Sequence, residues 1–276
     1  MIDLHLHSRA SDGTLSSAEL VSLAAARGVR LMSLTDHDCL DGTAEAAAAC
    51  DAAGIRFLPG VEVSVSWDRK TLHIVGVDID PQHAGLQAGL TRLQAVRDAR
   101  ALEIGRRLEK HGISGAHAGA LALAGEARLT RTHFARFLHQ TGHVKDEAQA
   151  YRRFLGRGKP GHVSAEWAGL EECIGWIHAA GGQAVLAHPL RYGFTRAWLV
   201  KALTAFKQAG GDAMEVVSGR SSPDDVAVSA HLAKRFELLG SVGSDFHAPS
   251  PYLQPGVQTP LPDGVQPVWE RFRDRN

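Results

Sequence analysis

The chain has 276 residues, of which 44% are hydrophobic, and its 30 basic side chains balance 30 acidic ones; this size suits one large α/β domain or two small ones. Zero net charge argues against a broad basic surface for long nucleic acid, and we expect neither a signal peptide nor a membrane span, because no apolar run approaches the ~18 residues that a span requires. Cys39, Cys50 and Cys173 have neither a metal-binding spacing nor an even number for disulfides, so we expect a cytoplasmic protein with reduced thiols.

Short apolar runs alternate with helical segments along most of the chain. The first run covers residues 2–7, and Ser16 and Glu19 then form the capping-box pattern that opens a helix at 18–27. Further strands are predicted at residues 31–35, 56–58 continuing into 61–65, 72–77, 183–186, 213–217 and 238–242. Further helices are predicted at residues 42–53, 170–180, 198–208 and 224–236. Such alternation predicts parallel strands joined by crossover helices, so the seven strands predict an α/β barrel that lacks one βα unit.

Two segments depart from this rhythm. The strand at 72–77 follows a hairpin-like turn and is expected to run antiparallel. Residues 81–165 are predicted to hold a long helix at 90–111, glycine- and alanine-rich turns, a helix at 132–139 and a helical stretch at 147–155. We interpret residues 81–165 as a helical insertion that covers the site of a barrel formed by residues 1–80 and 166–276.

The predicted insertion is basic and the predicted barrel is acidic. Residues 89–161 contain 14 basic and 6 acidic side chains, which leaves 16 basic and 24 acidic side chains in the rest of the chain. Such asymmetry can hold an anionic substrate between the two parts. A solvated basic helix face would give the same count.

Histidine and carboxylate side chains follow the predicted strands. His5 and His7 are two residues apart, so strand alternation places both imidazoles on one face. Barrel enzymes carry their catalytic groups at the C-terminal ends of strands, and further side chains of this kind accompany the pair: Asp12, His37, Glu62, His73, His188, Asp245 and His247. His73 is the exception, because it lies at the start of a run. Imidazoles mixed with carboxylates, without thiolates, favour Mn²⁺, Fe²⁺ or Zn²⁺ over Mg²⁺ alone, so we expect a metal centre.

These motifs, in this order, resemble the PHP family, which is named for polymerase and histidinol phosphatase domains. The matching motifs are His5-x-His7 with Ser8, Ser11-Asp12-Gly13, Thr35-Asp36-His37, Gly60-x-Glu62, His73, Ala187-His188-Pro189 and Ser244-Asp245-x-His247. The resemblance spans almost the whole chain outside the insertion. It implies a distorted (βα)7 barrel with a site for three metal ions, and Mn²⁺ as the expected metal.

The resemblance also implies an assignment of ligands to the three ions. One ion would be held by His5, His7, Glu62 and Asp245. A second would be held by Glu62, His73 and His188, with Glu62 as the bridge, and the third by Asp12, His37 and His247. Glu62, Asp245 and Asp12 are the residues expected to matter most for catalysis.

Within the family, the chain is most similar to small enzymes that remove the 3′-phosphate from nucleoside 3′,5′-bisphosphates, for example pAp to AMP and phosphate. The total length, the insertion and the stretch from Leu129 to Arg136 carry this similarity. Two ions bridged by a carboxylate lower the pKa of a shared water, so the expected reaction is attack of a metal-bridging hydroxide on phosphorus. The alternatives are a 5′-3′ exonuclease on short RNA, a histidinol phosphate phosphatase, and a metal-stabilised structural or regulatory domain. The expected partner is a small phosphorylated nucleotide or short RNA, and no obligate protein partner is implied.

Three residues of the sequence are predicted to contact substrate: Arg131, His133 and Asp12. Arginine suits bidentate binding of phosphate, although Arg131 also fits a surface position at a helix start and His133 fits a packed or capping histidine. Asp36 is predicted to support a ligand rather than to bind metal, as carboxylates behind a metal site often do.

Overall fold

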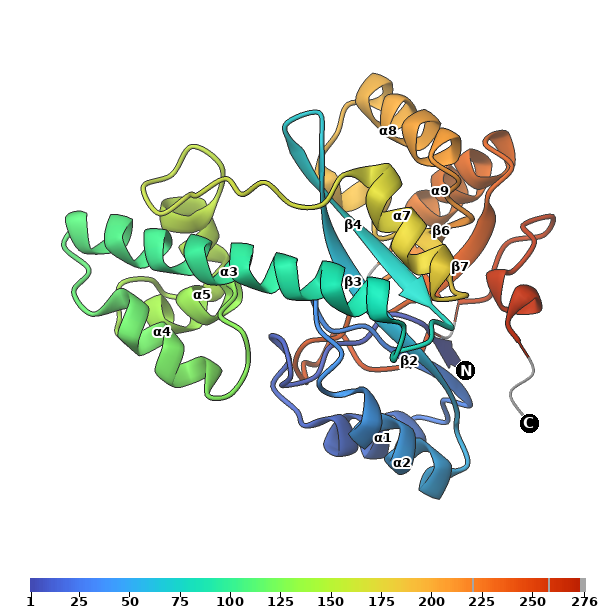
Figure 1. The fold of residues 1–276 in the computed structure, drawn as a ribbon, viewed down its shortest axis with the longest axis horizontal. Helices are drawn as coiled ribbons and strands as arrows, with labels where there is room; N and C mark the ends of the chain where they lie inside the picture. The colour runs from blue at the N-terminus through green and yellow to red at the C-terminus, as the bar shows by residue number, and fades with distance from the viewer. Residues whose placement is uncertain (220, 258, 274–276) are drawn as a thin grey trace.

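A seven-stranded sheet curls into a nearly closed barrel in this computed structural model, which describes residues 1–219, 221–257 and 259–273 (Figure 1). The strands follow one another in sequence order: β1 Ile2–Asp3, β2 Leu31–Leu34, β3 Arg56–Trp67, β4 Lys70–Val77, β5 Gln183–Leu186, β6 Ala213–Ser218 and β7 Leu239–Gly243. Neighbouring strands are parallel except at β4, which is antiparallel to both β3 and β5. The predicted α/β barrel and its reversed strand are therefore confirmed.

Hydrogen bonds join the residues that follow β1 to the end of β7 and the residues after it. The Leu4 amide donates to the Val242 carbonyl at 3.1 Å, and the His7 amide donates to the Phe246 carbonyl at 3.0 Å. The Asp245 amide in turn donates to the His5 carbonyl at 2.8 Å. The paired histidines of the N-terminus therefore lie beside the C-terminal end of β7.

Helices that connect the strands cover the outside of the sheet. They are α1 Ser17–Ala26, α2 Thr43–Ala53, α7 Leu170–Ala179, α8 Arg196–Gln208 and α9 Pro223–Arg235. Short 3₁₀ turns follow β5 at Pro189–Tyr192 and β7 at Val268–Arg271. The capping box predicted at Ser16 and Glu19 is confirmed at the start of α1. Aliphatic side chains from several strands, such as Leu4, Val75 and Val185, fill the interior of the barrel. No helix in the described part of the chain has the length and apolar character to cross a membrane.

The segment between β4 and α7 forms a helical lobe beside the barrel (Figure 1). Its elements are α3 Ala84–Lys110, α4 Ala116–Ala124, α5 Arg131–Gln140, α6 Glu147–Ala150 and a π-helical turn at Tyr151–Leu155. The predicted helix began at residue 90, whereas α3 begins at Ala84. Leu86, in the first turn that was not predicted, packs with Leu90 on the barrel core. The prediction of turns between α3 and α5 was wrong: α4 packs there through buried alanines, and its weak periodicity gave no signal. Residues 81 and 165 as boundaries of the insertion stay a prediction.

A buried ion pair ties α3 to the barrel. The Arg97 Nε donates to Asp38 Oδ2 at 2.6 Å, and its Nη2 donates to Ser64 Oγ at 2.9 Å. The Asp38 Oδ1 accepts from the Ser64 amide at 2.7 Å, and both charged side chains are buried. This contact fixes the lobe against the loop that follows β2 and against β3 itself.

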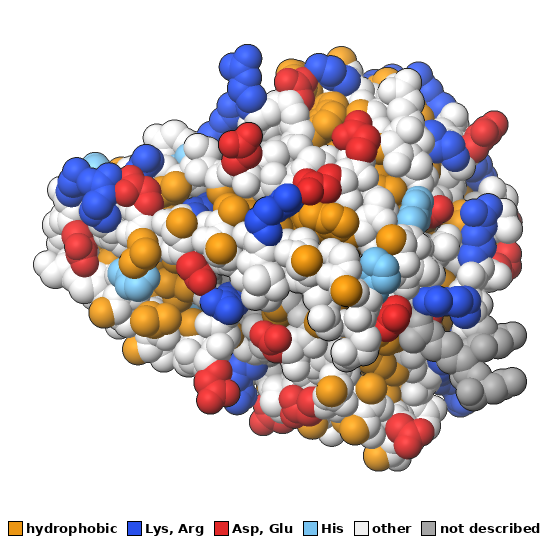
Figure 2. All heavy atoms as spheres, in the orientation of Figure 1, with side chains coloured by type: hydrophobic (Ala, Val, Ile, Leu, Met, Phe, Trp, Pro, Cys, Tyr) orange, Lys and Arg blue, Asp and Glu red, His pale blue; other side chains and the backbone are white. Residues whose placement is uncertain are grey.

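Much of the basic character of the lobe lies on its surface. Arg106 and Arg107 pair with Glu103, and Arg128 pairs with Asp98, all with exposed arginine side chains. On the face drawn in Figure 2, lysine and arginine side chains are interspersed with aspartate and glutamate side chains. Part of the excess positive charge therefore belongs to solvent-exposed arginines of the helices. Only arginines that point toward the barrel could bind a substrate there.

Candidate metal centre

One continuous cluster contains all the predicted metal ligands. Each lies within 4 Å of another member through a ring nitrogen and a carboxylate oxygen. The members are His5, His7, Asp12, His37, Glu62, His73, His188, Asp245 and His247. They come from the loops that follow β1, β2, β5 and β7, from β3 itself and from the start of the reversed strand β4.

The Glu62 carboxylate lies at the centre of the cluster. Its Oε1 is 2.8 Å from His73 Nδ1 and 3.1 Å from His188 Nε2. Its Oε2 is 2.8 Å from His37 Nδ1 and 3.3 Å from the Nε2 atoms of both His5 and His7. A carboxylate with imidazoles around both oxygens has the position that a bridging ligand needs.

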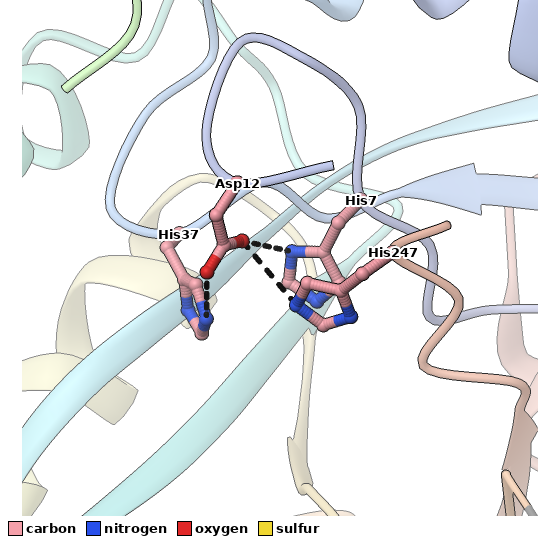
Figure 3. A group of neighbouring side chains, drawn as sticks. All are labelled: His7, Asp12, His37 and His247. Carbon is pink, nitrogen blue, oxygen red and sulfur yellow. Dashed lines mark ion pairs between the residues drawn. The ribbon is translucent and has the colours of Figure 1, made fainter. Parts of the chain in front are cut away.

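Asp12 organises a second part of the cluster (Figure 3). Its Oδ1 is 3.3 Å from His247 Nε2 and 3.9 Å from His7 Nδ1, and its Oδ2 is 3.9 Å from His37 Nε2. These four residues form one group able to hold an ion; His5, His7 and Asp245 form another, and His37, Glu62 and His73 a third. His7 and His37 thus each belong to two groups, whereas the resemblance gave each to one ion. The assignment to individual ions stays a prediction.

Several donor atoms of the cluster lack a hydrogen-bond partner. Among the described residues, the buried Nδ1 atoms of His7, His37 and His188 and the Oε2 of Glu62 have no hydrogen-bond partner. His37 Nδ1 and Glu62 Oε2 lie 2.8 Å apart but are not aligned for a hydrogen bond. Buried polar groups without partners are costly, and a cation between them would satisfy several at once. The residues therefore fit metal ions, and their oxygen and nitrogen donors suit Mn²⁺, Fe²⁺ or Zn²⁺.

The charges of the cluster favour cation binding. Burial would raise the pKa of Glu62, but the histidines around it, His37 first, lower it well below its ordinary value. The pKa values of Asp12 and Asp245 are lowered well below theirs by histidines in the same way, against the effect of burial. Burial also lowers the pKa of His37 to about 4, although Glu62 and Asp12 oppose this. Asp245 and Glu62 raise the pKa of His7 to about 10 despite its burial, so a cation must displace a proton there, whereas the ionised carboxylates and neutral His37 already have the protonation states that ligands need.

Two carboxylates support the ligands from behind. Asp36, as predicted, holds the loop that carries Asp12: it accepts from the Ser8 amide at 2.8 Å and from the hydroxyls of Ser8 at 2.7 Å and Ser11 at 2.6 Å. Glu215 of β6 was missed; its Oε1 is 2.6 Å from His5 Nδ1, and its Oε2 accepts from the His188 amide at 2.6 Å. Its signal in the sequence was a single carboxylate inside an otherwise apolar strand.

The helical lobe reaches the cluster through Thr132 and Arg136 of α5. The Thr132 hydroxyl donates to Asp12 Oδ2 at 2.9 Å, and Arg136 Nη2 donates to the Asp12 carbonyl at 2.7 Å. His133 is buried, and its Nδ1 accepts from the Thr130 amide at 3.1 Å, so it caps the helix; burial lowers its pKa to about 4. Arg131 lies at the first turn of α5 with its guanidinium 5.8 Å from the ring centroid of Tyr151. Roles in substrate binding for Arg131, His133 and Asp12 stay predictions.

Comparison with known proteins identifies close relatives. Residues 3–180 match the model of the PHP domain family. The chain is 47% identical to a 5′-3′ exoribonuclease of Haemophilus influenzae, with 98% of each protein covered. It is 48% identical to a 3′,5′-nucleoside bisphosphate phosphatase of Chromobacterium violaceum, with 99% of this chain and 97% of the relative covered.

A solved structure agrees closely with the whole fold. An amidohydrolase from Chromobacterium violaceum, determined with bound sulfate and no metal, superposes with a TM-score of 0.93 at 48% identity. The superposition covers 98% of this chain and 94% of that one. With its ligand motifs in order, its barrel and these relatives, the chain belongs to the PHP domain family.

Proposed function

We propose that this protein is a metal-dependent phosphoesterase that removes the 3′-phosphate from nucleoside 3′,5′-bisphosphates. The observation that carries the proposal is the cluster centred on Glu62, whose donors surround both oxygens of one buried carboxylate. The relative from Chromobacterium violaceum, a 3′,5′-nucleoside bisphosphate phosphatase at 48% identity, supports the choice of substrate. The helical lobe beside the cluster favours a substrate with a second phosphate over histidinol phosphate.

Three Mn²⁺ ions are the cofactor that we propose, held by the nine residues of the cluster. When bound, such ions lower the pKa of water and neutralise charge on a phosphate group. The side chains around them prepare the site: Glu215 occupies Nδ1 of His5, so that Nε2 faces Glu62. Thr132 holds one oxygen of Asp12 in place. Asp12, Glu62 and Asp245 are the residues that we propose as essential for turnover.

Metal content provides a direct test. Protein purified without chelator is expected to contain two to three transition-metal ions per chain, because the ligand set forms three groups. Elemental analysis measures this, and EDTA is expected to remove both the ions and the phosphatase activity. Only traces of Mn, Fe and Zn, together with activity that survives EDTA, would contradict the metalloenzyme proposal.

We further propose that arginines of the lobe bind the 5′-phosphate. Arg100 is half-buried, and burial together with the nearby Arg131 and Arg97 lowers the pKa of its guanidinium to about 9. Its Nε donates to the Val163 carbonyl at 2.9 Å, which leaves other N–H groups for a ligand. An anion between Arg100 and Arg131 would relieve their repulsion.

Replacing Arg131 by alanine tests the second phosphate. The kcat/KM for adenosine 3′,5′-bisphosphate is expected to fall about 10- to 100-fold, since a charge-assisted hydrogen bond is worth ~1.5–3 kcal/mol. The kcat/KM for a 3′-monophosphate should change little. Arg128→Ala is the matched control, because Arg128 is on the same segment but pairs with Asp98 at the surface. Equal losses on both substrates would remove this role from Arg131.

Exonuclease action on short RNA is the second candidate activity. The relative from Haemophilus influenzae is a 5′-3′ exoribonuclease and is nearly as similar as the phosphatase. Both activities would use the same cluster. The three cysteines are buried and free, which is consistent with the cytoplasmic location that we propose.

A further inference from the structure

Tyr192 contacts two of the candidate ligands on one side of Glu62. It is the last residue of the 3₁₀ turn that begins directly after His188. Its hydroxyl accepts from the His73 amide at 2.9 Å, and its ring packs edge to face with the His188 ring, with centroids 5.3 Å apart. His73 and His188 both approach the same oxygen, Oε1 of Glu62, at 2.8 and 3.1 Å. One tyrosine thus contacts both histidines that converge on this oxygen.

The hydroxyl of Tyr192 takes the place of a backbone partner for β4. The antiparallel register of β4 and β5, continued by one residue, places His73 opposite Ala187, and two residues in such a position can exchange two backbone hydrogen bonds. The Ala187 amide donates to the His73 carbonyl at 3.1 Å, whereas the His73 amide donates to the Tyr192 hydroxyl. The chain leaves the sheet at this point, because His188 has a φ of 31°, in the left-handed region. Tyr192 therefore provides the second bond that the strand would have provided.

The ring of Tyr192 is itself held by packing. It is half-buried and stacks on Phe194, with centroids 5.2 Å apart and planes at 27°. Lys70, the first residue of β4, lies with its Nζ 5.3 Å from the centroid of the Phe194 ring. Aromatic rings at these separations have preferred relative geometries, so His188 and Phe194 together restrict the direction in which the hydroxyl points.

We propose that Tyr192 is a positioning residue for the ion that Glu62, His73 and His188 would hold. The inference rests on the metal centre of the proposed function. The hydroxyl fixes the backbone of His73, and the ring restricts the His188 imidazole, so that one nitrogen of each histidine faces Oε1 of Glu62. Tyr192 acts through these ligands, because its hydroxyl is engaged by the His73 amide and lies 3.4 Å from the His73 carbonyl.

This role accounts for the way in which a reversed strand supplies a ligand near its start. The ladder between β4 and β5 begins only at Ile74, so His73 lies just outside it. Without the Tyr192 hydroxyl, one backbone bond from Ala187 would tie His73 to the β5 side. A ligand that is held in place before it binds gives up less freedom on binding. Loosening His73 should therefore weaken the binding of one ion, and the rate of the fully loaded enzyme should change little.

Tyr192→Phe removes the hydroxyl and keeps the ring. Equilibrium dialysis against graded Mn²⁺, followed by elemental analysis, should show one ion bound roughly tenfold more weakly than in the wild type, a loss usual when a residue that orients a metal ligand is changed. The Mn²⁺ concentration that half-activates hydrolysis of adenosine 3′,5′-bisphosphate should rise by the same factor, while kcat at saturating Mn²⁺ stays within about twofold. Tyr252→Phe is the matched control, because it removes a hydroxyl from a tyrosine that is 75% exposed; both measurements should be unchanged in it.

Phe194→Leu is a second variant, which keeps the hydroxyl but removes the ring on which Tyr192 stacks. It should raise the same Mn²⁺ midpoint about threefold, and an unchanged midpoint would decide against the inference if Tyr192→Phe did not fold. Wild-type Mn²⁺ binding in a folded Tyr192→Phe, or a fall in kcat that saturating Mn²⁺ does not restore, would overturn the inference and leave the proposed phosphatase standing. A wild-type chain that binds neither Mn²⁺, Fe²⁺ nor Zn²⁺ would reject both.

Discussion

Glu62→Ala is expected to lower kcat for the bisphosphate by at least ~10³-fold, which corresponds to ~4 kcal/mol of activation barrier. Glu62 is buried, and its two oxygens face five histidine side chains of the cluster. Its loss removes both the central donor and the negative charge that holds cations among these imidazoles. Steady-state kinetics with added Mn²⁺, alongside circular dichroism and metal content, would measure the effect.

Glu62→Gln separates charge from shape in the same experiment. Glutamine preserves the volume of the side chain but cannot bridge cations as an anion, so we expect a loss close to that of alanine. Glu172→Ala is a control, because Glu172 is an exposed glutamate that pairs with Arg92 at the surface. Near-normal rates in both Glu62 variants would mean that the chemistry takes place elsewhere.

Arg97→Met is expected to destabilise the fold by ~3–5 kcal/mol, the usual cost of leaving one buried charge without its partner. Arg97 is 6% exposed and Asp38 is fully buried, with Nε and Oδ2 2.6 Å apart. Urea denaturation measures the free energy of unfolding. Activity should fall together with stability, because Asp38 is next to the ligand His37 in the chain and is tied to the ligand Glu62. The Asp38 amide donates to the Glu62 carbonyl at 2.9 Å.

The double variant Arg97→Met with Asp38→Asn tests the reason for this loss. Removing both charges leaves no uncompensated carboxylate, so the double variant should be more stable than Arg97→Met alone. Arg92→Ala is the surface control, because its pair with Glu172 is exposed and should contribute little. A double variant as unstable as the single one would mean that packing, and not charge, accounts for the effect.

The barrel and the cluster could be predicted because each depends on local sequence rules. Short apolar runs at regular intervals predicted the strands, and the rule that barrel enzymes carry functional groups at strand ends placed His5, His37 and Asp245 together. The reversed strand was predictable from the hairpin turn before it. These features need no knowledge of distant contacts.

What could not be predicted depends on tertiary packing. Helix α4 is rich in alanine and lacks a marked apolar face, so only its contacts with α3 and α5 reveal it. A role for Thr132 was not predicted, because a charged guanidinium and an imidazole made its neighbours Arg131 and His133 the stronger candidates for binding a phosphate. The direction of each side chain on the first turn of α5 decides the contact, and the threonine reaches Asp12.

The single reversed strand also explains where the lobe emerges. In a regular barrel each strand ends at the mouth, and the helix after it returns to the base. Because β4 runs the other way, the chain leaves this strand at the base of the barrel. Helix α3 then runs past the sheet toward the mouth; its 27 residues span about 40 Å at 1.5 Å per residue. Any segment inserted between α3 and α7 therefore lies beside the cluster of candidate ligands, and barrel closure is not disturbed. One change of strand direction gives the fold a place where new substrate preferences can be acquired while its chemistry is kept.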